Sequence, residues 1–159
     1  MIAFTIAGWS GSGKTTLIER LIEGFRDRGR SVAVVKRVPH GADLEPQGKD
    51  TARFRRAGAV PVFAVGAGEM LTVEPVASEA AAWKQIVERA GAQDVLLLEG
   101  LVVPGVPVIE VTMMGYPLKT PVERLVALVG DGPVVADRPR FSAGAVGELL
   151  DFMEESRER

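Results

Sequence analysis

Short apolar runs and amphipathic stretches alternate along the chain, and their lengths predict strands and helices in turn. Residues 2–7 and 31–36 are apolar runs too short for helices, which is typical of buried strands. Between them, residues 15–28 repeat leucine, isoleucine and phenylalanine at helical spacing, with charged residues on the opposite face. Gly29 stands where a helix C-cap is expected. The opening of the chain therefore predicts a strand, a helix and a second strand.

The same alternation continues to the end of the chain. After a polar loop, we expect a short helix from Asp50 that ends before Gly58, a hairpin over 61–75, a helix over 78–90, strands over 94–100, 106–113 and 124–129, and a helix from Ser142. Strands that are apolar on both faces and alternate with helices indicate a parallel sheet covered on both sides. We predict one α/β domain over residues 1–159: a twisted, mostly parallel sheet flanked by helices, with a β-hairpin.

The turn between the first strand and the first helix carries the clearest chemistry. Residues 8–15 read Gly-Trp-Ser-Gly-Ser-Gly-Lys-Thr and match the phosphate-binding pattern G-x-x-x-x-G-K-S/T in its expected context. Glycines allow backbone N–H groups to approach phosphate oxygens, and the helix N-terminus favours the same anion. Lys14 is expected to reach the β- and γ-phosphates, and the Thr15 hydroxyl to bind Mg²⁺. The pattern predicts a P-loop NTPase fold whose nucleotide-binding residues are Gly11, Ser12, Gly13, Lys14, Thr15 and Thr16.

A carboxylate is needed to complete the magnesium shell, and two acids flank the strand at 94–100. Ligands gather at the carboxyl ends of parallel strands, which favours Glu99 over Asp94. Glu99 is therefore the predicted second metal residue, through water, or the residue that orients the attacking water. A purely structural role for this acid is the alternative.

The loop after the second strand is rich in basic residues and leads to the same edge of the sheet. Lys36, Lys49 and Arg53 are candidates to stabilise a transferring phosphate or to receive a second anionic ligand. Asp50 is a candidate catalytic acid near magnesium or water, or a helix N-cap. In the same loop, His40 is a candidate ligand contact and Asp43 is a candidate to approach magnesium or a water, with a solvated loop as the alternative.

Composition narrows the setting in which this site would work. The net charge is −2, which argues against a broad nucleic-acid surface, and no apolar run is long enough to cross a membrane. The sequence contains no cysteine, which suits a reducing compartment. The N-terminal apolar run lacks a basic flank and leads directly into the glycine turn, so we expect a cytoplasmic protein without a signal peptide.

Five segments of the chain form a combined pattern: Gly-Trp-Ser-Gly-Ser-Gly-Lys-Thr-Thr-Leu, the strand ending Val-Val-Lys, His40 with Asp43, Gly-Lys-Asp-Thr-Ala-Arg ending in Arg-Ala-Gly-Ala, and Asp-Val-Leu-Leu-Leu-Glu-Gly. Together they resemble the MobB family, the molybdopterin-guanine dinucleotide biosynthesis protein B family. The resemblance extends to about Glu110 and fades beyond it. This chain has Lys36-Arg37 where members often show Lys-His, and it lacks an Asn-Lys-x-Asp guanine motif.

The resemblance implies a GTP-binding homodimer with, at most, weak GTPase activity. Such proteins assist a nucleotidyltransferase that attaches GMP to molybdopterin, so GTP, Mg²⁺, molybdopterin and that enzyme are the implied ligands and partner. By position, Gly8 to Thr16 form the phosphate site, Lys49 to Arg53 a second-ligand or switch segment, and Glu99 the acid near magnesium. Asp131 is a candidate acceptor for guanine N1 and N2, or a turn residue.

Two other functions use the same glycine turn. A P-loop small-molecule kinase would grip an anionic acceptor with the basic loop and use Asp43 or Asp50 as the base. No clear arginine-bearing lid follows late in the chain, and Arg138-Pro139-Arg140 is a poor candidate. A metal-insertion GTPase would need ligands for nickel or zinc that a chain with one histidine and no cysteine supplies poorly.

Overall fold

A computed structural model describes residues 1–38 and 50–156 of the chain. These residues form two compact units. The first unit joins Met1–Arg37 to Arg89–Arg159, and the second is the continuous segment Val38–Glu88. The chain therefore leaves the first unit after its second strand and returns to it near the end of a later helix.

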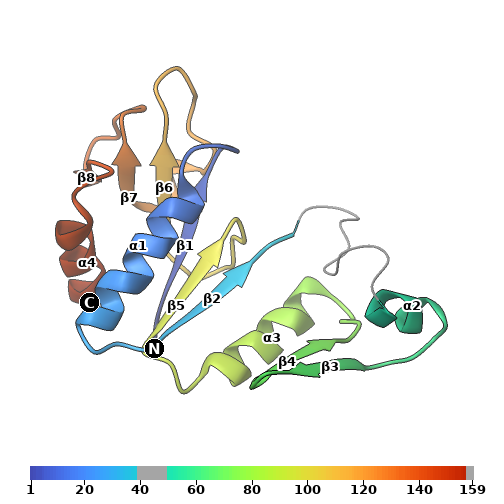
Figure 1. Ribbon diagram of the computed structural model, residues 1–159. Helices are drawn as coiled ribbons and strands as arrows, with labels where there is room; N and C mark the ends of the chain where they lie inside the picture. The colour runs from blue at the N-terminus through green and yellow to red at the C-terminus, as the bar shows by residue number, and fades with distance from the viewer. Residues whose placement is uncertain (39–49, 157–159) are drawn as a thin grey trace. The chain divides into compact units, whose positions relative to one another are not determined.

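A parallel sheet forms the centre of the first unit (Figure 1). Its order is β2-β5-β1-β6-β7-β8, and every neighbouring pair runs parallel. The strands are β1 (Ile2–Gly8), β2 (Val32–Lys36), β5 (Val95–Glu99), β6 (Val108–Thr112), β7 (Leu125–Gly130) and β8 (Arg140–Phe141). The predicted fold class, a mostly parallel sheet flanked by helices, is confirmed.

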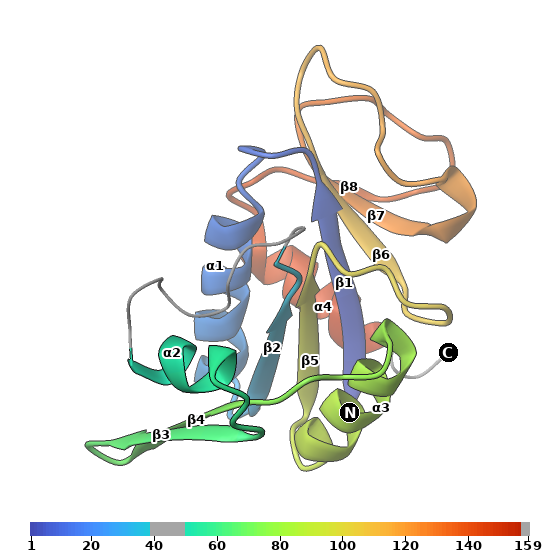
Figure 2. The same cartoon turned by 90° about the vertical axis from the view of Figure 1, so that its right-hand side faces the viewer.

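The strand register brings distant parts of the sequence to one edge of the sheet. Glu99 is level with Ile6 on one side and with Lys36 on the other, and Gly8 is level with Val111. Because parallel strands end at a common edge, the residues that follow β1, β2, β5, β6 and β7 emerge together. Figure 2 shows the turn after β1 at the same edge as the loops after β6 and β7.

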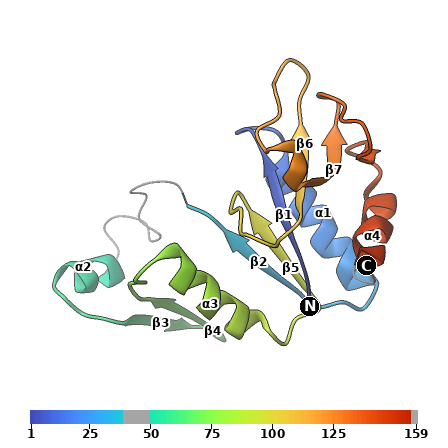
Figure 3. The same ribbon diagram turned by 180° about the vertical axis from the view of Figure 1, so that it is seen from behind.

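Two helices, α1 (Lys14–Asp27) and α4 (Val146–Glu155), pack side by side on one face of this sheet (Figure 3). Leu21 and Phe25 of α1 and Met153 of α4 are fully buried against strand residues of the main core. At the end of α1, Gly29 adopts φ 73° and its N–H donates to the Arg26 carbonyl. Gly29 thus ends the helix at the predicted position, because a left-handed residue there satisfies the last carbonyls.

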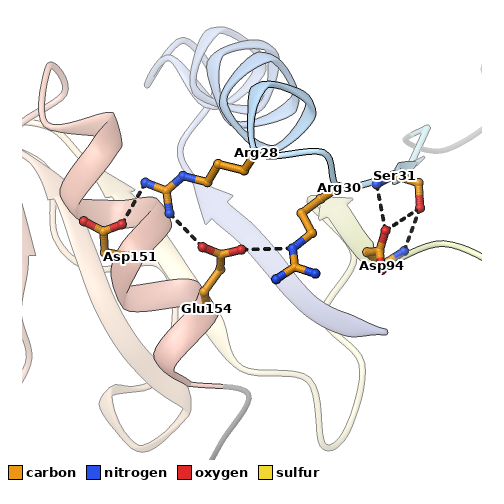
Figure 4. A network of polar contacts seen from close by, with 6 residues as sticks. All are labelled: Arg28, Arg30, Ser31, Asp94, Asp151 and Glu154. Atoms are coloured by element: carbon orange, nitrogen blue, oxygen red, sulfur yellow. Dashed lines mark hydrogen bonds and ion pairs between the residues drawn. The ribbon is translucent and has the colours of Figure 1, made fainter.

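Ion pairs hold the end of α1 to α4 (Figure 4). The Arg28 guanidinium lies 2.7 Å from Asp151 and 2.8 Å from Glu154, and Arg30 lies 3.2 Å from Glu154. The hydrogen bond from Arg28 lowers the pKa of Glu154, and the same bond raises the pKa of Arg28. These contacts fix the C-terminal end of α1, the helix that starts at the glycine turn.

Asp94 lies just before β5, at the amino end of the sheet, and accepts hydrogen bonds from the Ser31 N–H and hydroxyl at 2.9 and 2.8 Å (Figure 4). This acid is therefore part of the connection between β2 and β5. Its position agrees with the expectation that Asp94 lies away from the ligand edge.

The second face of the sheet carries a smaller core of four strand residues, Ala7, Val108, Leu125 and Leu128. Leu118 and Val135, from the loops after β6 and β7, pack against them. A short 3-10 helix, η1 (Val122–Arg124), leads into β7. The loops at the ligand edge are thus attached to the sheet by apolar contacts of their own.

The segment 38–88 contains α2 (Asp50–Arg56), the antiparallel strands β3 (Val62–Gly66) and β4 (Glu69–Val73), and most of α3 (Glu79–Ala90). The predicted hairpin is confirmed, with Ala67 and Gly68 at positive φ in its tight turn. At the start of α3, the Ser78 hydroxyl accepts a hydrogen bond from the Ala81 N–H at 3.1 Å. The helix therefore begins with a side-chain N-cap.

Two details differ from the predictions. The last helix begins at Val146 rather than Ser142, because residues 142–145 form a turn in which the Ala145 N–H donates to the Ser142 carbonyl. The two-residue strand β8 was not anticipated, since Arg140 and Phe141 are too few to give a pattern. Within residues 1–38 and 50–156, no helix combines the length and apolar character needed to span a membrane.

Candidate functional site

The glycine turn joins the end of β1 to the first residue of α1, as the sequence predicts. Gly8, Gly11 and Gly13 adopt φ values of 140°, 76° and 91°, which side chains with a Cβ rarely tolerate. A Cβ on Gly8 would lie 2.4 Å from the Val111 carbonyl oxygen and 2.8 Å from the Ser12 Oγ. The turn therefore requires glycine for backbone conformation at three positions and for close packing at the first.

Lys14, the first residue of α1, folds back over the turn and donates from Nζ to the Trp9 carbonyl at 2.7 Å. Burial lowers the pKa of Lys14, and the charge of Lys119 lowers it further. Glu99 acts in the opposite direction, and Lys36 adds a smaller lowering effect. Among the described residues, two lysines and one carboxylate act on the charge of Lys14, which is a setting that favours a bound anion.

Thr15, Glu99 and Lys36 come together at the ligand edge. The Thr15 hydroxyl donates to Glu99 Oε1 at 3.0 Å, and Lys36 Nζ lies 3.4 Å from Glu99 Oε2. The Glu99 side chain is 14% exposed, whereas that of Lys36 is 59% exposed. The carboxylate is thus held at the end of β5 by one partner from α1 and one from β2.

This arrangement fits magnesium with a bound phosphate. A hydroxyl and a carboxylate oxygen lie close together, and oxygen is the donor that magnesium prefers. No cluster of three or more acids or histidines occurs in the part of the chain that the structure describes. Magnesium sites of this kind use one or two protein oxygens and take the remaining ligands from phosphate and water. Thr15 and Glu99 are the residues that would hold the ion.

Two further residues of the turn also lie on or beside α1. Thr16 is exposed in the first turn of the helix. The Ser12 Oγ is buried without a hydrogen-bond partner among the described residues. Buried hydroxyls without a partner are uncommon, and a ligand of the glycine turn would complete this one.

The remaining predicted residues belong to other parts of the chain. Asp50 and Arg53 belong to the segment 38–88, where they pair with each other across one turn of α2 at 3.3 Å. Asp131 follows β7 and lies 3.7 Å from Arg140, with its side chain 83% exposed. Lys49, His40 and Asp43 lie outside the described residues.

Trp9, Glu110 and Lys119 also belong to this edge, and sequence reasoning missed them. Trp9 occupies a variable position of the glycine motif and donates from Nε1 to the Pro117 carbonyl at 2.8 Å. Glu110 is a buried acid inside an apolar strand, which was the one available signal. Lys119 lies in a stretch without a motif, so only the fold brings it near.

Comparison with known proteins places the chain in a family. The family model described as molybdopterin guanine dinucleotide synthesis protein B matches residues 3–131. The chain belongs to the MobB family. The resemblance predicted from the sequence is therefore confirmed over most of the chain.

Relatives of known name agree with this family. A molybdopterin-guanine dinucleotide biosynthesis adapter protein of Haemophilus influenzae is 31% identical over 155 residues, covering 94% of this chain and 85% of that protein. The adapter protein of that name from Escherichia coli is 42% identical over 59 residues, covering 37% of this chain and 33% of that protein.

Solved structures of the family share the fold. A crystal structure of a molybdopterin-guanine biosynthesis protein B superposes with a TM-score of 0.74 at 27% identity, covering 98% of this chain and 99% of the other. The structure of Bacillus subtilis MobB gives a TM-score of 0.72 at 23% identity, covering 98% and 97%. The P-loop fold of this MobB member is thus found in structures of its family.

Proposed function

We propose that this MobB family member binds GTP with magnesium on the glycine turn and acts as an adapter in molybdopterin-guanine dinucleotide formation. Its role would be to assist a nucleotidyltransferase that attaches GMP to molybdopterin. The observation that carries the proposal is the contact of Thr15 with Glu99 beside the Lys14 turn. Family membership supplies the pathway, and this contact supplies the chemistry.

Each residue of the site has a separate task in this proposal. The turn amides and Lys14 bind the phosphate chain, and Thr15 with Glu99 holds the ion. Bound magnesium neutralises charge on the phosphate oxygens. Glu99 also accepts from the Thr15 hydroxyl and pairs with Lys36, which keeps its carboxylate at the edge of the sheet.

Hydrolysis is expected to be slow at most. In the described residues, Glu99 is the only acid that contacts Thr15, and its carboxylate oxygens are already engaged by Thr15 and Lys36. Asp50, Lys49 and Arg53 are proposed to form a second-ligand or switch segment. Asp131 is proposed as the acceptor for guanine.

Assembly as a homodimer, in the cytoplasm, completes the proposal. On one face of the hairpin, Phe63, Val65 and Met70 are 57%, 81% and 65% exposed. Val62 and Val73 on the other face are buried. An apolar strand face of this kind supports an interface, and sedimentation at several protein concentrations tests it.

Calorimetry tests the nucleotide. GTP with magnesium should bind more tightly than ATP with magnesium, and Lys14→Ala should abolish the affinity for both. Lys84→Ala is the matched control, because Lys84 is an exposed lysine on α3. If Lys14→Ala binds GTP as the native protein does, the assignment of the nucleotide site to the glycine turn is wrong.

Reconstitution tests the role. Adding the protein to a molybdopterin nucleotidyltransferase, with GTP and molybdopterin, should increase the yield of guanine dinucleotide, and the Lys14→Ala variant should not. Rapid ATP consumption that depends on one small metabolite would instead support a kinase.

A further inference from the structure

The loop after β6, residues 113–121, contacts the glycine turn through Trp9. The Trp9 Nε1 donates to the Pro117 carbonyl at 2.8 Å, and the Trp9 and Tyr116 rings lie 6.0 Å apart. Lys119 Nζ lies over the Trp9 ring, 5.8 Å from its centroid. Three residues of one loop thus contact a single side chain of the phosphate-binding turn.

The buried side chain of Glu110 holds the backbone of this loop. The Glu110 side chain belongs to β6 and is 1% exposed. Its two carboxylate oxygens accept the Lys119 N–H at 2.7 Å and the Thr120 N–H at 2.8 Å. A buried carboxylate that accepts two backbone N–H groups holds the main chain firmly. The backbone of Lys119 is therefore fixed beside the glycine turn.

The charge of Lys119 is left unbalanced at this position. In residues 1–38 and 50–156, no carboxylate pairs with Lys119, whereas Lys36 pairs with Glu99. Lys14 donates to the Trp9 carbonyl and Lys119 lies over the Trp9 ring, so both lysines contact the same residue of the turn. Two like charges held near one turn repel each other. An anion bound between them would be attracted by both lysines and would offset their repulsion.

The order of the strands places Lys119 opposite the magnesium residues. Glu99 and Lys36 end β5 and β2 on one side of β1, whereas the 113–121 loop follows β6 on the other side. A phosphate chain lying on the glycine turn would therefore have Thr15 and Glu99 on one flank and Lys119 on the other. Lys14 lies between the two flanks, on the helix that follows β1.

We propose that Lys119 is a second phosphate-binding cation of the glycine turn, held over Trp9 by the loop that Glu110 anchors. This inference rests on the proposed function, because it assumes that the turn binds a nucleotide triphosphate. Lys119 binds oxygens of the phosphate chain from the β6 side, and Trp9 reports its movement. Sequence motifs give no indication of this residue.

The test uses the full chain with Trp83→Phe, which leaves Trp9 as the single tryptophan. In this background we compare Lys119→Met, which keeps the stem without the charge, Lys119→Arg, which keeps the charge, and Lys84→Met, an exposed control. Calorimetry measures the affinity for GTP and for inorganic tripolyphosphate, each with magnesium. Tripolyphosphate carries the phosphate chain alone, so it separates contacts to phosphate from contacts to the nucleoside.

Lys119→Met should weaken both ligands by roughly tenfold or more, the loss expected for a charge-assisted hydrogen bond. Lys119→Arg should retain most of the affinity, and Lys84→Met should change nothing. GTP should alter Trp9 emission in the parent protein, because Lys119 leaves the ring for the phosphate, and this change should be smaller in Lys119→Met. Thermal unfolding midpoints should be equal in all four proteins.

Four results would overturn the inference. If Lys119→Met binds both ligands normally while Lys14→Ala binds neither, Lys119 is no phosphate ligand and the proposed function stands. If Lys119→Met loses GTP affinity but keeps tripolyphosphate affinity, or if Lys119→Arg fails as badly, the residue serves the nucleoside or the loop instead. If the parent protein binds no triphosphate, both the inference and the proposed function fall.

Discussion

The Thr15 hydroxyl lies 3.0 Å from a carboxylate oxygen of Glu99, although the two residues are 84 positions apart in the chain. The parallel pairing of β1 with β5 accounts for this proximity, because it aligns the start of α1 with the end of β5. Lys36, on the next strand, reaches the other carboxylate oxygen. A hydroxyl, a carboxylate and an ammonium group from three elements thus meet beside the glycine turn.

Removing the charge of Glu99 should selectively weaken the binding of magnesium. We expect Glu99→Gln to reduce the magnesium-dependent gain in GTP affinity by roughly tenfold or more, the usual effect of losing a metal-supporting carboxylate. Affinity for GTP in the absence of magnesium should change little. Calorimetry with and without magnesium measures both quantities. Glu19→Gln, an exposed change on α1, is the control, and an unaltered magnesium dependence in Glu99→Gln would contradict the assignment.

A methyl group on Gly8 should disrupt the turn. The added Cβ would meet the Val111 carbonyl and the Ser12 Oγ at a φ of 140°, so Gly8→Ala is strained twice. We expect GTP binding to be lost and the free energy of unfolding to fall by about 1–3 kcal/mol. Gly147→Ala is the opposite control: it lies in α4 with open space around it and should stabilise by about 0.5–1 kcal/mol. Equal effects of the two changes would refute this account.

Glu110 should contribute to stability through the loop that it holds. Glu110→Gln replaces one acceptor oxygen by an amide that donates, so either the Lys119 or the Thr120 N–H loses its buried partner. We expect the free energy of unfolding in urea to fall by about 1–3 kcal/mol. Glu123→Gln, an exposed neighbour in η1, should have little effect. A Glu110→Gln protein as stable as the native one would show that these bonds contribute nothing.

The pair of Arg28 with Glu154 should make stability depend on pH in the acid range. The hydrogen bond from Arg28 lowers the pKa of Glu154 in the folded protein, so the folded state binds this proton less readily than the unfolded state. The stabilisation is then complete above the unfolded pKa of about 4.3 and is lost as pH falls through the lower folded pKa.

The variant Glu154→Gln isolates this contribution. It should be less stable than the native protein by about 0.5–1 kcal/mol at pH 7. The difference should shrink below about pH 4, as the native carboxylate takes up its proton. Unfolding in urea at several pH values measures it, with exposed Glu155→Gln as the control. A difference that stays constant down to pH 2 would rule out the ion pair as its source.

The glycine turn and the mostly parallel sheet were accessible from the sequence because they depend on local patterns. The Gly8–Thr15 motif fixes a turn, apolar runs fix strands, and their alternation with helices fixes parallel pairing. Glu99 followed from these rules, since an acid at the end of a parallel strand must lie at the ligand edge. The same rule correctly assigned Asp94 to the other edge.

The rest of the site depends on where loops go, which local patterns do not specify. Lys119 has no motif, and its position beside Trp9 is set by the buried bonds from Glu110 to the loop backbone. The start of α4 was placed too early because Ser142 is a good helix-starting residue, yet the chain there is still turning away from β8. Neither feature follows from a local sequence pattern.

The insertion of residues 38–88 between β2 and β5 has a consequence for how the sheet assembles. Among the described strands, β2 pairs only with β5, and the whole segment lies within the loop that this pairing closes. Closing a longer loop costs more conformational entropy than closing a shorter one, and it slows the strand pairing that depends on it. We therefore expect the amides of Val32–Lys36 to exchange with deuterium sooner than those of β1 at the centre of the sheet. The ion pair between Lys36 and Glu99 would then form late in folding.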